Sequence, residues 1–228
     1  MTDELWNSYY TSISACNTLI KIIGENTKLS PDELSPIGGE AHFLRAFNYF
    51  QLVRWFGEVP LLTEENQDNA AKEPQASVAR IYEQIVSDLK NAELTLPLSQ
   101  DDPSRPSRWA QSVACKSLFD NGGIPLNETS CYALARDKAN EVISEKVYTL
   151  EKVYSQLWLW SNRKINSEFI FALYASSDNA TGSYIHQAVR PTDHGENGWA
   201  DWTSDKRFLE TFSRRRWQPF ERNFFILG

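Results

Sequence analysis

The sequence predicts a mainly α-helical protein, with a loop-rich part and a few short strands after the helices. In residues 1–147, apolar side chains recur every three or four positions in segments separated by breaks containing glycine, proline or polar residues, which is typical of packed amphipathic helices. From residue 148 the pattern changes to short runs rich in β-branched and aromatic residues, VYTL, LWLW and EFIFALY, a composition that favours strands. We therefore expect a helical-hairpin part over 1–147 and a loop-rich part over 148–228.

The first two helices are expected over residues 5–23 and 40–56. Gly24 is expected to end the first, and a loop containing Pro31, Pro36, Gly38 and Gly39 to follow it. The second, EAHFLRAFNYFQLVRWF, runs without a breaker into Gly57, with a proline soon after, which is a typical helix stop. Its apolar residues occupy more than one face, so we expect it to pack on more than one side.

Three more helices are predicted further along the chain. After a polar, acidic linker, Ser77 is expected to cap an amphipathic helix that stops before Pro97. Its expected inward residues are Val78, Ile81, Tyr82, Ile85, Leu89 and Ala92. A fourth helix is expected from Trp109 to residue 121, and a fifth from Ser130. The fifth has Ala135, Ala139, Val142 and Ile143 on one face. Short connections make these helices antiparallel neighbours, although no sequence repeat recurs.

The end of the chain is expected to be less helical. Residues 169–174 could form a buried strand, residues 178–202 a long loop, and Thr203 could cap a final short helix. A structureless loop of this length is uncommon in a compact domain unless it binds something. The long loop is therefore the first place to look for a ligand.

Composition and charge exclude several kinds of protein. The 228 residues carry 23 Lys plus Arg against 30 Asp plus Glu, for a net charge of −7, so nucleic acid is not an expected partner. The cysteines, Cys16, Cys115 and Cys131, are odd in number and lack metal-ligand spacing. We interpret them as buried thiols. No apolar run approaches the ~18 residues of a membrane-spanning helix.

Catalytic, metal and cofactor motifs are not apparent. The sequence has neither HExxH nor GxSxG, GxGxxG or a phosphate loop. His42, within the aromatic helix, is interpreted as a satisfied histidine of the core or its rim. A metal site remains an alternative only in the loop that holds His186, Asp193, His194 and Glu196. We expect no enzyme, no cofactor and no metal, and interpret carboxylate pairs such as Glu64 with Glu65 as solvated surface charges.

Aromatic residues in a polar loop are the most informative functional feature. Trp199 and Trp202 lie close in sequence to Asn197 and Asp201, with Tyr184 in the same loop. Flat indole rings can cover the apolar face of a sugar while amide and carboxylate groups bind its hydroxyls. The candidate glycan-binding residues are therefore Trp199, Trp202, Asp201 and Asn197. Alternatively, the tryptophans fasten the loop to the helices.

One long segment resembles a known family. The run GGEAHFLRAFNYFQLVRWFGEVPLLTEE closely resembles the segment that marks the SusD/RagB family, and SVARIYEQIVSDLKNAELTLP resembles that family's next helix. The run NSEFIFALY resembles its Asn-Ser-Glu strand, and GWADWTSDKRFLETF its loop followed by a short helix. The resemblance extends over most of residues 1–212.

The resemblance implies a fold, a function and a location. It implies irregular tetratricopeptide-like helical hairpins and a loop-rich portion that completes a glycan site, without catalysis. It also implies an outer-membrane lipoprotein, exposed on the cell surface of Bacteroidetes, that passes oligosaccharides to a SusC-like TonB-dependent transporter for nutrient uptake. Within the motif, Arg45, Phe47 and Tyr49 resemble packing residues.

Family members are considerably longer than this chain. We therefore expect residues 1–228 to be a single truncated SusD-like domain. A leader bearing a lipid anchor is expected before Met1, and a large further part after Gly228.

Two other functions stay open on the residues alone. A helical-hairpin scaffold that binds only protein would use the aromatic loop as an interface. A glycosidase would need two carboxylates flanking the sugar bond, one with a raised pKa, and the sequence shows no such pair. Binding of sugar, binding of a peptide and release of reducing sugar would separate these functions.

Overall fold

The computed structural model describes residues 2–25, 30–98, 107, 123, 127–158 and 167–171. Its elements in chain order are α1 (Thr2–Glu25), α2 (Pro31–Phe56), β1 (Val59–Pro60), the 3₁₀ helix η1 (Gln67–Lys72), β2 (Gln75–Ala76), α3 (Val78–Thr95), α5 (Ser130–Glu145) and the 3₁₀ helix η3 (Tyr154–Trp158). The chain divides into units Met1–Leu173 and Tyr174–Gly228, and every described residue belongs to the first. The expected mainly α fold class is confirmed.

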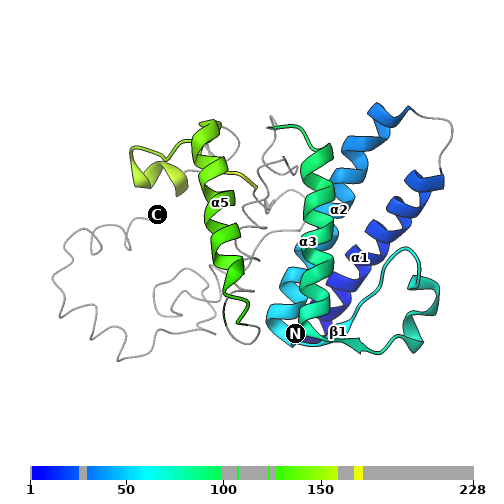
Figure 1. Ribbon diagram of the computed structural model, residues 1–228. Helices are drawn as coiled ribbons and strands as arrows, with labels where there is room; N and C mark the ends of the chain where they lie inside the picture. Colours follow the sequence, from blue (N-terminus) through cyan, green and yellow to red (C-terminus); the bar gives the residue numbers. More distant parts are fainter. Residues whose placement is uncertain are drawn as a thin grey trace, which may run out of the picture. The chain divides into compact units, whose positions relative to one another are not determined.

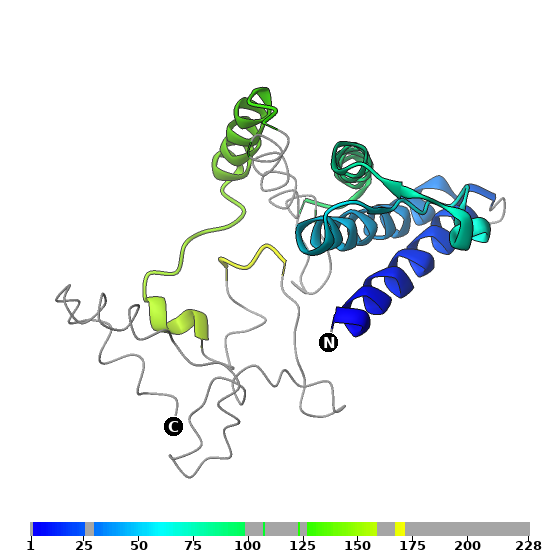
Figure 2. The same cartoon turned by 90° about the horizontal axis from the view of Figure 1, so that it is seen from below.

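Helix α2 lies between α1 and α3 (Figures 1 and 2). It is antiparallel to α1, since Phe56 at the end of α2 meets Trp6 near the start of α1, with ring centroids 5.1 Å apart, and a Cβ at Gly38 would meet Ile23. Helix α3 runs back along the other side, because the start of α2 meets its last residue, Thr95. The expectation that the second helix packs on more than one side is confirmed.

The start of α2 corrects the sequence prediction. The helix begins at Pro31 and contains the residues that were expected to form a loop up to 39. Ser30 and Glu33 form a reciprocal capping box, in which the Ser30 amide donates to Glu33 Oε2 at 2.9 Å. Pro31 suits the first helical position, whereas Pro36 lies inside the helix and removes one backbone hydrogen bond. The capping box and the packing described next outweigh that loss.

Gly39 allows α2 and α3 to approach each other closely. A Cβ at this position would lie inside van der Waals contact of Thr95 Oγ1 and 3.0 Å from Leu96 Cγ. The glycine that suggested a loop therefore serves helix packing. Gly24, which was expected to end the first helix, lies within α1, and a Cβ there would meet nothing within 4 Å.

The segment between α2 and α3 contains more structure than the polar linker that was expected. Helix α2 ends as predicted at Gly57, whose φ is 71° and whose amide donates to the Val53 carbonyl at 3.0 Å. The strands β1 and β2 pair antiparallel, with Val59 opposite Ala76. They bring the two ends of the segment together around η1.

Helix α3 matches its prediction closely. Ser77 caps it by accepting a hydrogen bond from the Arg80 amide at 3.4 Å, and the helix ends before Pro97. Its apolar face is buried as expected, except that Val78 is only partly buried. One charged residue, Asp88, is buried on the same face and is only 1% exposed.

The elements after residue 127 agree only in part with the prediction. Helix α5 begins at Ser130, but of the apolar residues expected on one face, Ala135 is buried and Ile143 is 71% exposed. Residue 169 is irregular and residues 170–171 form a bend, so the strand prediction is wrong for residues 169–171. The Thr149 amide donates to the Ser167 carbonyl at 3.1 Å, and this single backbone bond does not make a ladder. The predicted fourth helix, long loop and final helix lie outside the described residues, apart from Ser107 and Gly123 beside the fourth helix.

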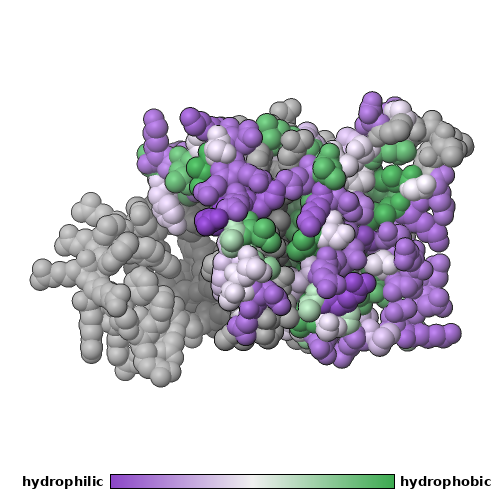
Figure 3. Space-filling view, in the orientation of Figure 1, coloured by the Kyte–Doolittle hydropathy of each residue, from purple (hydrophilic) through white to green (hydrophobic). Residues whose placement is uncertain are grey.

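One apolar cluster fills the space between α1, α2 and α3. Its fully buried members come from these helices, β1 and the residue after α3: Ile13, Phe43, Ala46, Tyr49, Phe50, Leu52, Val53, Val59, Ile81, Tyr82, Ile85, Leu89, Ala92 and Leu96. In the view of Figure 3, hydrophilic side chains cover much of the described surface, with smaller apolar areas between them. In the described part of the chain, no helix is both long and apolar enough to cross a bilayer.

Candidate functional site

The most extensive polar cluster of the described residues lies inside the helical core. Arg45 of α2 and Asp88 of α3 are 2% and 1% exposed, and they form its centre. Arg45 Nε donates to Asp88 Oδ2 at 2.8 Å, and Nη2 donates to Oδ1 at 2.7 Å. This two-point contact matches the planar guanidinium to the carboxylate and fixes the rotation of α2 against α3.

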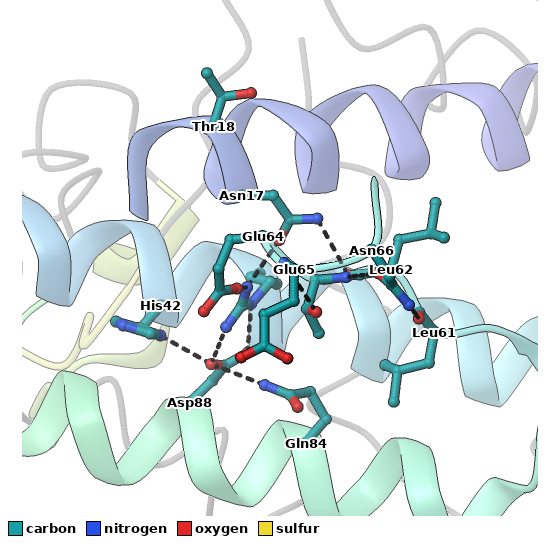
Figure 4. A network of polar contacts seen from close by, with 12 residues as sticks. Asn17, Thr18, His42, Leu61, Leu62, Glu64, Glu65, Asn66, Gln84 and Asp88 are labelled. Carbon is teal, nitrogen blue, oxygen red and sulfur yellow. Dashed lines mark hydrogen bonds and ion pairs between the residues drawn. The ribbon is translucent and has the colours of Figure 1, made fainter. Parts of the chain in front are cut away.

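Two more residues use the third donor nitrogen of Arg45. Nη1 donates to Asn17 Oδ1 of α1 at 2.8 Å and also to Glu64 Oε2 in the segment after β1. Arg45 therefore joins its own helix to α1, α3 and one loop at a single buried point. Figure 4 shows its partners Asn17, Glu64 and Asp88 from close by.

Asp88 accepts two further hydrogen bonds at Oδ1. His42 donates from Nδ1 at 2.8 Å, and Gln84 donates from Nε2 at 3.2 Å. The His42 side chain is 20% exposed, so it closes the network at the rim of the core. The interpretation of His42 as a satisfied histidine is confirmed.

The same cluster holds the loop that follows β1. The Tyr49 hydroxyl donates to the Leu62 carbonyl at 2.8 Å and accepts from the Leu62 amide at 2.7 Å. Asn17 Nδ2 also donates to that carbonyl, at 3.1 Å. Asn66 accepts from the Thr63 amide at 2.7 Å, which tightens the turn. Side chains of α1 and α2 thus replace the strand partners that this loop lacks.

Electrostatics stabilise the charged forms of the central pair. Burial alone would lower the pKa of Arg45, but hydrogen bonds and charge from Asp88 and Glu64 raise it above its ordinary value. Burial alone would raise the pKa of Asp88, yet Arg45 and then His42 hold it below its ordinary value. Both groups are therefore ionised at neutral pH.

This arrangement suits a structural role better than a chemical one. Among buried side-chain polar atoms of the described residues, only Gln67 Oε1 lacks a hydrogen-bond partner. No group of three metal-ligating side chains occurs in the part of the chain that the structure describes. Burial raises the pKa of the Cys16 thiol to about 11, which makes it a poor nucleophile. The cluster joins helices, and its polar side chains bind one another and the neighbouring backbone.

The comparisons with known proteins agree with this helical core. Residues 1–116, which contain the whole Arg45 network, match a family described as SusD-like, starch-binding and associating with the outer membrane. The chain belongs to the SusD-like family. The resemblance that the sequence suggested is confirmed.

Individual relatives match more of the chain than residues 1–116. The SusD-like protein P25 of Formosa agariphila is 25% identical over 219 residues, which are 95% of this chain and 37% of that protein. The crystal structure of a SusD superfamily protein from Parabacteroides distasonis has a TM-score of 0.77 and 29% identity, over 85% of this chain and 41% of that one. This chain thus spans well under half the length of either relative.

A further solved structure was determined with a xylogluco-oligosaccharide. It has a TM-score of 0.66 and 23% identity, and the match covers 75% of this chain and 35% of that one. At this identity the likeness concerns the fold.

The glycan-binding residues proposed from the sequence do not belong to this core. Trp199, Trp202, Asp201 and Asn197 lie outside the described residues, as do Tyr184 and the loop considered for a metal. The packing roles expected for Arg45, Phe47 and Tyr49 from the SusD-like motif are confirmed, since Arg45 and Tyr49 are buried and Phe47 packs against the core.

Most members of the polar network had not been predicted from the sequence. Glu64 was interpreted as a solvated surface charge, but its side chain is 31% exposed and pairs with Arg45, which corrects that interpretation. Glu65, its neighbour, is exposed as expected. A usable signal existed for Asp88, which lies on the apolar face of α3 at helical spacing from Ile81 and Ile85. A carboxylate on such a face requires a buried cationic partner.

Proposed function

We propose that this SusD-like chain is part of a non-catalytic protein that binds oligosaccharides at the outer membrane and delivers them to a TonB-dependent transporter of the SusC type. The observation that carries the proposal is the match of residues 1–116 to a family described as starch-binding and associating with the outer membrane. The solved relative with a xylogluco-oligosaccharide supports the same class of ligand.

The proposed ligand residues belong to the aromatic loop near the end of the chain. Trp199 and Trp202 would stack on sugar rings, while Asp201 and Asn197 would bind hydroxyl groups. The described core supports a glycan site formed by other residues. Because its polar side chains already bind one another, the core serves as a scaffold and leaves the glycan contacts to other residues.

Titration of the 228-residue chain with oligosaccharides tests this function. The probes are a maltooligosaccharide, for the starch class, and a xylogluco-oligosaccharide, with binding followed by calorimetry and tryptophan fluorescence. We expect saturable binding of at least one probe and a loss of about tenfold in affinity in Trp199→Ala or Trp202→Ala, equivalent to about 1.4 kcal/mol. A folded chain that binds neither probe would overturn the proposal.

A matched control is available on α2. Trp55 is 68% exposed on the surface of α2, and it is far from the aromatic loop in sequence. Trp55→Ala removes the same side chain and should leave affinity unchanged. Equal losses in all three variants would assign the effect to stability and not to sugar contact.

Transporter pairing and lack of catalysis have their own tests. Affinity-tagged protein in detergent-solubilised outer membranes should co-purify with a TonB-dependent barrel, identified by mass spectrometry. Capture of other proteins without sugar binding would instead favour the helical scaffold function. Incubation with either probe should release no reducing sugar. Release that a single carboxylate substitution abolishes would show a glycosidase.

A further inference from the structure

A short segment after η3 connects two distant parts of the described chain. We call residues 167–171 the clasp. Its first half is bound to the segment that follows α5: the Ser167 carbonyl accepts from the Thr149 amide at 3.1 Å, and Thr149 Oγ1 donates to Ser167 Oγ at 2.9 Å. Glu168 Oε2 accepts from the Glu151 amide at 2.8 Å.

The other end of the clasp is bound to α2 by one aromatic ring. Phe171 meets Phe43 edge-on, with ring centroids 5.1 Å apart and planes at 74°, and meets Phe47 at 5.8 Å and 69°. Phe43 and Phe47 stack on each other at 6.3 Å. Phe171 is half-buried, whereas Phe43 is 1% exposed. The clasp therefore inserts a single ring against an aromatic pair of the helical core, in a geometry that aromatic rings favour.

The position of Phe171 in the chain gives this contact its importance. It lies just before Leu173, the last residue of the first unit. The candidate glycan-binding residues all belong to the unit that begins at Tyr174. Phe171 is thus the last described attachment to the helical core before the chain enters the second unit.

We propose that Phe171 is a positioning residue for glycan binding, which anchors to α2 the chain that leads to the sugar-binding residues. This inference rests on the proposed function. Fixing Phe171 on α2 in advance reduces the conformational freedom that glycan binding has to remove, which raises affinity. Phe171 itself needs no contact with sugar.

Two substitutions of Phe171 and one control test the inference in the complete chain. Phe171→Ala removes the ring, Phe171→Leu keeps an apolar side chain at the same place, and Trp55→Ala removes an exposed ring from the same helix that the clasp contacts. Hydrogen exchange reports the clasp through the amides of Thr149 and Glu151, which donate to it. Calorimetry with the maltooligosaccharide and the xylogluco-oligosaccharide reports glycan binding.

We expect Phe171→Ala to raise exchange of the two amides and to weaken sugar binding, each by about tenfold, equivalent to about 1.4 kcal/mol. The helical signal of the core should persist, Phe171→Leu should retain most of the affinity, and Trp55→Ala should match the wild type. Unchanged affinity or unchanged exchange in Phe171→Ala would overturn the positioning role.

The failures are distinguishable. If the wild type binds a probe and Phe171→Ala binds it equally well, the positioning role is overturned and the proposed function stands. If the folded wild type binds neither probe, the proposed function is overturned and the positioning role with it. Loss of the core's helical signal in both Phe171 variants would make Phe171 a core residue and overturn the inference.

Discussion

The core of α1, α2 and α3 and the helix α5 differ in how deeply their ion pairs are buried. In the core, Arg45 and Asp88 are almost fully buried and are held by hydrogen bonds from several elements. In α5, Lys138 binds Glu93 of α3 at 2.6 Å and Glu141 at 2.7 Å, but its side chain is 24% exposed. Of all the residues of α5, only Ala135 is buried.

The same chemistry therefore has different consequences in the two regions. When one member of a buried ion pair is removed, water cannot solvate the other, so its charge stays uncompensated. In a partly exposed pair, a charge that loses its partner is solvated by water at little cost. The core should consequently depend on individual polar residues, whereas α5 should tolerate their replacement. Four predictions test this contrast.

The largest effect is expected at the central ion pair. Arg45→Met or Asp88→Leu should each lower the free energy of unfolding by about 3–5 kcal/mol, since either removes the two-point partner of a buried charge. The double variant R45M/D88L should lose less than the sum of the two single losses. Chemical denaturation followed by circular dichroism measures these changes.

The partly exposed ion pairs of Lys138 provide the control. Lys138→Met breaks both of them and should cost less than about 1 kcal/mol. A loss at Lys138 as large as that at Arg45 would contradict the contrast between the regions.

Apolar truncation should divide the two regions in the same way. Leu89 of α3 is 2% exposed and belongs to the core cluster, so Leu89→Ala should cost about 2–5 kcal/mol. Leu134 of α5 is 54% exposed, so Leu134→Ala should change stability by no more than about 0.5 kcal/mol. Thermal denaturation of both variants in one buffer measures the difference, and similar melting temperatures would disprove it.

A methyl group at Gly39 tests how closely the core helices pack. Gly39→Ala would place a Cβ against Thr95 and Leu96, and we expect a loss of about 1–3 kcal/mol in unfolding free energy. Gly24→Ala, in a helix where a Cβ would meet nothing within 4 Å, should instead stabilise by up to about 1 kcal/mol. Denaturant titrations of the pair should move in opposite directions, and movement in the same direction would refute the steric account.

Lowering the pH should destabilise the core by protonating Asp88. The loss of unfolding free energy should be smaller than the loss caused by substituting Asp88. The folded pKa of this carboxyl lies below its ordinary value of 3.8, so the folded state favours the ionised form. That stability is fully present above the ordinary pKa and is lost as the pH falls below it. Unfolding free energies measured from pH 6 to pH 2 should fall more steeply in the wild type than in Asp88→Asn, and parallel curves would contradict this linkage.

Much of the local structure could be predicted from the sequence because it depends on neighbouring residues. The extent of α3, its Ser77 cap and the stop at Gly57 follow from apolar spacing, side-chain capping and glycine at positive φ. The early start of α2 also had a local signal in the Ser30–Glu33 capping box, which two prolines and two glycines obscured. The family was predictable as well, since its motif is continuous in the chain.

The candidate site divides in the same way between local and distant information. The aromatic loop that carries Trp199 and Trp202 was found from composition, and its glycan contacts stay a prediction. The Arg45 network was missed because its members are separated by long stretches of chain, with Asn17 and Asp88 on opposite sides of α2. Glu64 looked like any surface carboxylate until folding placed it beside a buried guanidinium.

By itself the sequence determined the helical class, the bounds of α3, the end of α2, the membership of a glycan-binding family and the absence of a local catalytic motif. Each of these depends on residues close together in the chain. Only the tertiary structure decided that Gly39 permits close packing, that Glu64 is paired and that Phe171 attaches to α2. The physical reason is that burial and pairing depend on the energies of contacts between distant segments, which no local pattern encodes.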